Sequence, residues 1–261
     1  MYKRQDKGDI EIFGEEITPT NYKLKSQIGV VMQNVAVFDE LTVSENIDYF
    51  CGLYIRDKAL RKQYVEEAIA FVGLEHFRKF YPKKLSGGLL RRLNIACGIA
   101  HKPKLIILDE PTVAVDPQSR NKILEGIVEL NRRGATILYT SHYMDEVEQI
   151  CSRIAIIDQG KNLALGTTEE LKKLIKKSEI ITIDILTLTE EDIAAIRQLP
   201  HVYEVSFDQH KLTVLCSGGQ HNLIHVLDYL QKKSYSFGYV HSELPSLNDV
   251  FLEITGKELR D

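Results

Sequence analysis

Short, uninterrupted apolar runs constrain the fold of this chain more than any other feature of its sequence. Residues 28–32, 105–108, 135–139 and 154–157 form such runs, each bounded by polar residues. Runs of this kind are typical of strands buried on both faces of a parallel sheet. Segments with helical spacing separate them, at residues 62–72, 86–100 and 117–133. This alternation predicts an α/β fold with a doubly wound parallel sheet.

The second half of the chain has a different character. Residues 168–177 predict a charged, N-capped helix, whose lysines indicate a solvated face rather than a surface for acidic lipid. The following segments predict strand, helix, hairpin, helix and strand, at residues 180–188, 190–198, 202–207 with 211–216, 220–232 and 235–241. This βαββαβ order is that of a small ferredoxin-like α+β module. We therefore expect a sheet domain over residues 1–167, a linker helix over 168–178 and an accessory domain over 179–261.

Composition and charge exclude several classes of protein. The 33 Lys and Arg residues against 37 Asp and Glu give a formal net charge of −4, which argues against a nucleic-acid partner bound by bulk charge. No apolar run approaches the roughly 18 residues that cross a bilayer, and no signal peptide is evident. The cysteines are far apart, which favours small buried residues in a reducing compartment: Cys51, Cys97, Cys151 and Cys216. We expect a cytosolic globular protein.

Two adjacent carboxylates, Asp109 and Glu110, follow the run at residues 105–108 directly. Ligands of open α/β sheets bind at the carboxyl ends of the strands. One acidic residue there can hold Mg²⁺, and the next can orient an attacking water. The pair alone would more simply be a strand that ends in solvated acids.

Three weaker signals accompany this pair. Ser86, Gly87 and Gly88 precede a predicted helix, where a hydroxyl group and free backbone N–H groups can cradle an anion. By itself this triplet is a turn and a helix cap. His142 and Gln33 each follow a predicted strand, and either residue alone would be structural.

Together these signals carry a family resemblance. In the order VVMQ, LSGG, LDEP and TSH, the chain resembles the ATP-binding subunits of ABC transporters over essentially its whole length. The resemblance implies that Asp109 is the Walker B aspartate near Mg²⁺ and that Glu110 is the catalytic base. It also implies that Gln33 is the Q-loop glutamine, which touches Mg²⁺ and the attacking water, and that His142 is the switch histidine at the γ-phosphate of ATP.

The resemblance also implies a dimer. Ser86, Gly87 and Gly88 then form the signature motif, which binds ATP held by the opposite subunit, and Asp116 belongs to the D-loop across the interface. The second subunit is either an identical chain or a different ATP-binding chain. The protein would act on the cytoplasmic face of the cell membrane, bound peripherally to a separate transmembrane permease and not to nucleic acid.

The phosphate loop of this family has no counterpart in the printed sequence. No GxxxxGK[ST] motif occurs, and residues 8–17 resemble the strand that follows the Walker A helix. We expect that the sequence is truncated before or at Walker A, with the first strands and helix missing, and that this piece alone is inactive. A non-catalytic regulatory subunit is the alternative interpretation.

The function implied by the resemblance is ATP hydrolysis that drives export. Residues 38–55 and 245–261 resemble the exporter branch, which handles drugs, polysaccharides or similar cargo. A soluble ABC-type ATPase outside transport is the alternative, although one motif set and no heptad run argue against it. We also predict a permease dock over residues 38–55, formed by Phe38, Leu41, Val43, Tyr49, Phe50 and Tyr54, with burial in a helical subdomain as its alternative.

Overall fold

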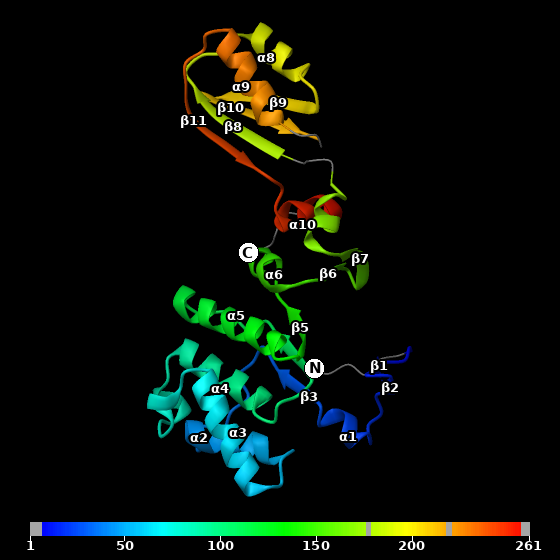
Figure 1. Cartoon of the computed structure of the whole chain (residues 1–261), viewed down its shortest axis with the longest axis vertical. Coiled ribbons are helices and arrows are strands. Elements are labelled where there is room, and N and C mark those ends of the chain that lie inside the picture. The colour runs from blue at the N-terminus through cyan, green and yellow to red at the C-terminus, as the bar shows by residue number, and fades with distance from the viewer. Residues whose placement is uncertain (1–6, 176–178, 218–220, 257–261) are drawn as a thin grey trace. The chain divides into compact units, whose positions relative to one another are not determined.

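The computed structural model describes residues 7–175, 179–217 and 221–256 (Figure 1). The chain divides into two compact units, Met1–Glu146 and Val147–Asp261. The domain boundary that we expect between residues 167 and 168 comes later in the chain than this division, and it stays a prediction. Within the described residues, no helix combines the length and the apolarity that a bilayer crossing requires.

A three-stranded parallel sheet forms the centre of the first unit. Its order is β3 (Ile28–Val31), β4 (Leu105–Asp109) and β5 (Thr136–Thr140). Val31 pairs with Leu108, and Leu108 pairs with Tyr139. These three strands confirm the first three predicted runs, and because they are parallel their carboxyl ends share one edge.

Helices occupy the connections between these strands. The first connection holds α2 (Val43–Gly52), α3 (Lys58–Phe71), the 3₁₀ turns η1 (Glu75–Phe77) and η2 (Pro82–Lys84), and α4 (Gly87–Ile99). The second holds α5 (Pro117–Arg132), and α6 (Met144–Ile150) follows β5. Two short strands, β1 (Glu11–Ile12) and β2 (Glu15–Glu16), and α1 (Tyr22–Lys25) precede the sheet. Helices α2, α3 and α4 enclose an apolar core that includes Ile47, Ile69 and Leu93, all fully buried.

Helix α4 lies directly against β3, because each element has a glycine at the contact, Gly29 on β3 and Gly98 on α4. A Cβ atom on Gly29 would collide with the carbonyl oxygen of Gly98 and lie 2.7 Å from Cγ of Pro103. A Cβ atom on Gly98 would lie 2.6 Å from Cγ2 of Val31. This close approach fixes the helix that begins at Gly87 against the sheet.

Two expectations about the apolar runs are wrong. The strands are not buried on both faces. Val30 and Leu138, which both pair with Ile107 of β4, are 48% and 53% exposed. The run at residues 154–157 does not join the parallel sheet. It forms β6 (Ile154–Asp158), which pairs antiparallel with β7 (Lys161–Gly166).

The reason for the second difference lies in the turn after β6. Gln159 and Gly160 both have positive φ, of 49° and 74°, which suits the tight two-residue turns that join antiparallel strands. Ile154 and Ile156 are buried, whereas Ile157 is 64% exposed. The burial therefore alternates as in a half-buried strand.

The second unit contains the predicted ferredoxin-like module. Strands β8 (Glu179–Ile185), β9 (Val202–Asp208), β10 (Lys211–Cys216) and β11 (Phe237–Glu243) form an antiparallel sheet of order β11-β8-β10-β9. Helices α8 (Glu190–Arg197) and α9 (Asn222–Lys232) lie on one face of it (Figure 1). The buried core includes Ile183, Ile196, Leu212 and Val226. The βαββαβ prediction is confirmed.

Two short helices complete the second unit. They are α7 (Thr168–Lys172) and α10 (Leu247–Thr255). The helix predicted at residues 168–177 is thus confirmed over residues 168–172, whereas residues 173–175 are not helical, because the helix ends at Lys172. Residues 176 and 177 lie outside the described part of the chain. Residue 220, at the predicted start of the helix 220–232, also lies outside it.

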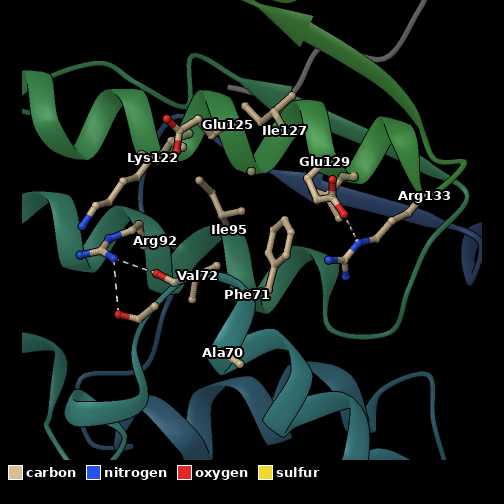
Figure 2. A pocket seen from close by; sticks show the side chains of 14 residues that line it. Ala70, Phe71, Val72, Arg92, Ile95, Lys122, Glu125, Ile127, Glu129 and Arg133 are labelled. Carbon is tan, nitrogen blue, oxygen red and sulfur yellow. Dashed lines mark hydrogen bonds and ion pairs between the residues drawn. The ribbon is translucent and has the colours of Figure 1, made fainter.

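A cavity of about 530 Å³ lies between α3, α4 and α5 (Figure 2). The apolar side chains of Phe71, Ile95 and Ile127 line it together with charged groups at its rim, where Arg133 bonds Glu129 at 2.8 Å. None of the predicted site residues lines this cavity.

The wall of this cavity offers a test of the packing. A Cβ atom on Gly126, within α5, would lie 3.5 Å from two ring carbons of Phe71, an ordinary contact distance. Gly126→Ala is therefore expected to raise the free energy of unfolding by about 0.5–1 kcal/mol, since alanine also favours the helix. Urea unfolding measures this change, with Gly29→Ala as the contrasting variant expected to lose stability. A loss in Gly126→Ala would contradict the packing of α5 on Phe71.

Candidate active site

The ends of β4 and β5 are joined by side-chain and backbone hydrogen bonds. Asp109 is the last residue of β4, and Thr140 is the last residue of β5. The Thr140 hydroxyl donates to Oδ1 of Asp109 at 2.8 Å. The Glu110 N–H faces both the carbonyl oxygen and the hydroxyl of Thr140, each at 3.2 Å. The predicted carboxylate pair therefore lies at the carboxyl edge of the parallel sheet.

The Glu110 carboxylate is held by the predicted histidine. Nδ1 of His142 donates to this carboxylate, at 3.1 Å from Oε1 and 3.0 Å from Oε2. Glu110 has a φ of 48°, a conformation that is costly for a residue other than glycine and is concentrated at functional sites. Its side chain is 20% exposed and that of His142 is 56% exposed. The carboxylate is thus oriented and still open to water, as a general base requires.

Arg91 belongs to this edge, although the sequence analysis did not identify it. It is 4% exposed. Its guanidinium donates to five carbonyl oxygens, those of Met32, Gln33, Asp109, Glu110 and Pro111. Burial lowers the pKa of Arg91, while the nearby carboxylates of Asp109 and Glu110 raise it. One buried cation therefore connects the loop after β3 with the loop after β4.

Gln33 is exposed in the loop after β3, and α4 holds this loop by its backbone. Nη1 of Arg91 donates to the Gln33 carbonyl at 2.5 Å. Asn94 donates to the Met32 carbonyl at 3.2 Å and accepts from the N–H of Ala36 at 3.1 Å. The side chain of Gln33 thus projects from a loop that is anchored to the same helix as Asp109 and Glu110.

The predicted signature residues lie with Asp116. Ser86 caps α4 and is exposed together with Gly87, whereas Gly88 is buried. A Cβ atom on Gly88 would lie 2.8 Å from Cβ of Ser119 and 3.0 Å from Oδ2 of Asp116. Gly88 is therefore required for packing against α5.

Asp116 caps α5 by accepting from the Ser119 N–H at 3.0 Å, and this hydrogen bond lowers the pKa of Asp116. Apart from Gln33, the predicted site residues thus form two groups. One contains Asp109, Glu110 and His142, and the other contains Ser86, Gly87, Gly88 and Asp116.

The first group suits a magnesium ion that is shared with phosphate. Within the described residues, no three His, Cys, Asp or Glu side chains are placed to hold a metal by themselves. Mg²⁺ with nucleotides is bound through one or two carboxylates and the substrate phosphates rather than by a protein cage. Asp109 and Thr140 provide a carboxylate and a hydroxyl of the right chemistry.

Comparison with known proteins places the chain in a family. The model described as "ABC transporter" matches residues 1–113, and that described as "ATP-binding protein DrrA1-3-like, C-terminal domain" matches residues 166–255. Linearmycin resistance ATP-binding protein LnrL of Bacillus subtilis is 37% identical over 258 residues, which cover 98% of this chain and 83% of LnrL. The chain belongs to the ABC transporter family of ATP-binding subunits.

Other ABC subunits are also similar to this chain. Nod factor export ATP-binding protein I of Ralstonia nicotianae is 30% identical over 98% of this chain and 79% of its own length. Daunorubicin/doxorubicin resistance ATP-binding protein DrrA of Streptomyces peucetius is 31% identical over 99% and 78%. Among solved structures, cbiO1 of Clostridium perfringens, part of the ABC transporter complex cbiONQ, has a TM-score of 0.58 at 26% identity over 64% of this chain and 68% of cbiO1.

Membership of the family defines the general activity. ABC ATP-binding subunits bind and hydrolyse ATP, and they work with transmembrane permeases. The relatives act in resistance and export, which argues against the alternative of an ATPase outside transport. The accessory module of this ABC subunit corresponds to the matched C-terminal domain.

Proposed function

We propose that this ABC subunit hydrolyses MgATP at the shared edge of β3, β4 and β5, and thereby drives export through its permease. The observation that carries the proposal is the hydrogen bond from His142 Nδ1 to the Glu110 carboxylate beside Asp109. Asp109 would hold Mg²⁺, either directly or through water. When bound, Mg²⁺ neutralises negative charge on the phosphates.

The side chains at this edge then have separate tasks. Glu110 orients the attacking water and accepts its proton, because the carboxylate is fixed and partly open. His142 holds this carboxylate and would contact the γ-phosphate. Gln33, on its anchored loop, would contact the same water and metal.

The second group would bind the nucleotide held by another subunit. The N-terminal N–H groups of a helix attract phosphate, and α4 presents its N-terminus at the exposed Ser86 and Gly87. This arrangement supports a head-to-tail dimer, with an identical or a different ATP-binding chain. Asp116 would face the dimer interface beside Gly88.

Export is supported by the names of the relatives, which refer to linearmycin resistance, Nod factor export and daunorubicin/doxorubicin resistance. A permease partner would place this subunit on the cytoplasmic face of the membrane. The proposed contact surface is an aromatic patch formed by Phe38, Tyr49 and Phe50. Phe38 lies 4.9 Å from Tyr49 and 5.9 Å from Phe50 between ring centroids.

Two of the three rings in the patch are exposed, and hydrogen bonds hold the backbone of Phe38. Phe38 and Tyr49 are 42% and 47% exposed. The side chain of the buried Asn46 accepts a hydrogen bond from the Phe38 N–H at 2.8 Å and donates one to the Phe38 carbonyl at 3.0 Å. Val43, by contrast, is fully buried in the core around α2. Its assignment to the dock is wrong, because its side chain faces α3 and α4 rather than solvent.

Cross-linking tests this surface. Single cysteines at Phe38 or Tyr49, with Cys151 replaced by serine, are expected to cross-link to the permease in the assembled transporter. A cysteine at the exposed Glu125 on α5 is the matched control. Cross-links from Glu125 and none from the patch would contradict the proposed dock.

A further inference from the structure

We propose that Arg120 and Tyr143 connect Asp116 to His142, so that Tyr143 is a positioning residue for the switch histidine. The inference rests on the proposed function, which assigns Asp116 to the dimer interface and His142 to hydrolysis. The two residues stand in different groups of the site. The connection would transmit the position of one group to the other.

The connection begins in the first turn of α5. Asp116 caps this helix, and the Arg120 N–H donates to the Asp116 carbonyl at 2.9 Å. Because Arg120 lies within the turn that Asp116 initiates, a shift of the loop carries the arginine with it.

The Arg120 guanidinium lies against two groups on the segment around His142. Its Cζ is 4.7 Å from the centroid of the Tyr143 ring, and its Nε is 3.3 Å from Oε1 of Glu146. The Arg120 side chain is 33% exposed and that of Glu146 is 5% exposed. A cation over an aromatic ring is attracted more strongly when both are partly removed from water.

Glu146 fixes the far side of this arrangement. Its Oε2 accepts from Thr112 at 2.7 Å and from Tyr139 at 2.5 Å. Burial and the hydrogen bond to Glu146 raise the pKa of Tyr139, so Tyr139 keeps its proton and donates. Arg120 is therefore held between an anchored carboxylate and the Tyr143 ring.

Tyr143 in turn contacts the ring of His142. The two ring centroids are 4.2 Å apart with planes inclined by 38°, and the Tyr143 N–H donates to Ser141 Oγ at 3.0 Å. His142 is 56% exposed. Its ring is therefore in contact with both the Glu110 carboxylate and the Tyr143 ring.

The geometry predicts a specific kinetic effect. Neither Arg120 nor Tyr143 belongs to the groups proposed to hold nucleotide, so their loss should change kcat and spare the KM for ATP. Misplacement of a positioned group by about an ångström can cost up to about 100-fold in rate. We expect a loss of about tenfold in kcat.

The experiment uses the protein made from its complete gene, assembled with its permease. Tyr143→Leu removes the ring, whereas Tyr143→Phe retains it and is the matched control. We expect Tyr143→Leu and Arg120→Met each to lower kcat about tenfold, with Tyr143→Phe close to wild type. The double variant should be no slower than either single variant, because both break one connection. Unchanged kcat in Tyr143→Leu, multiplicative losses or a change in KM alone would overturn the inference.

A second readout does not depend on hydrolysis. Labelled histidine gives an NMR signal for the His142 ring, assigned by its loss in His142→Gln. Arg120→Met, which removes no contact to His142 itself, is expected to shift that signal, and Tyr143→Phe to leave it nearly in place. A signal unmoved in Arg120→Met would also overturn the inference. If the proposed function itself is wrong, Glu110→Gln will leave hydrolysis unchanged, and this result separates that failure from a failure of the present inference.

Discussion

Glu110→Gln is expected to lower ATP hydrolysis by about 100-fold or more while leaving ATP binding intact. The amide keeps the shape of the carboxylate and one acceptor oxygen for His142 Nδ1, but it cannot accept a proton from water. With ATP bound and not consumed, the variant should accumulate as a closed dimer. Phosphate release and particle mass in the presence of MgATP measure the two effects.

The matched control for this substitution is Glu125→Gln, on the exposed face of α5. It makes the same chemical change away from the sheet edge and should leave the rate within about twofold of wild type, as for surface substitutions. If Glu110→Gln retains more than about a tenth of the wild-type rate, Glu110 is not the base.

Arg91→Met is expected to lower the free energy of unfolding by about 3 kcal/mol or more. Its guanidinium serves five backbone carbonyl groups at the sheet edge. Each hydrogen bond to a charged group contributes about 1.5–3 kcal/mol, and buried carbonyls left without a donor add a penalty. Hydrolysis should fall with stability, because the loops that carry Gln33 and Glu110 lose their common anchor.

The neighbouring Arg92 provides the control. It is only half-buried, and its guanidinium bonds the carbonyls of Val72 and Gly73, at 2.8 and 3.4 Å, away from the sheet edge. Arg92→Met should cost about 1 kcal/mol and spare the reaction. Urea unfolding followed by circular dichroism compares the two variants. Equal losses in both would show that the anchoring role of Arg91 is misassigned.

Much of the fold follows from local pattern. The runs that became β3, β4 and β5 are apolar and separated by helices, and parallel strands bring their carboxyl ends to one edge. Asp109 and Glu110 follow β4 and His142 follows β5, so this rule puts all three at the same edge. The antiparallel pairing of β6 did not follow, because an apolar run alone does not show whether the next turn reverses the chain, as Gln159 and Gly160 do.

The parts of the site that the sequence did not reveal depend on tertiary contacts. Arg91 and Arg92 are adjacent and identical in type, yet one is buried among carbonyls and the other lies beside a cavity. In the sequence, the only indication that Arg91 is buried is its position among the apolar residues of the predicted helix 86–100. Gly88, expected to approach phosphate, also packs on Ser119, and helical spacing cannot show such a neighbour. The roles assigned to the site residues stay predictions.

The most direct test of the central claim is magnesium-dependent phosphate release by the protein from its complete gene, assembled with its permease. We predict release from ATP that stops when magnesium is chelated and falls about 100-fold or more in Glu110→Gln. Release that continues unchanged in Glu110→Gln, or its absence in the wild-type complex supplied with MgATP, would contradict the assignment of this sheet edge as the site of hydrolysis.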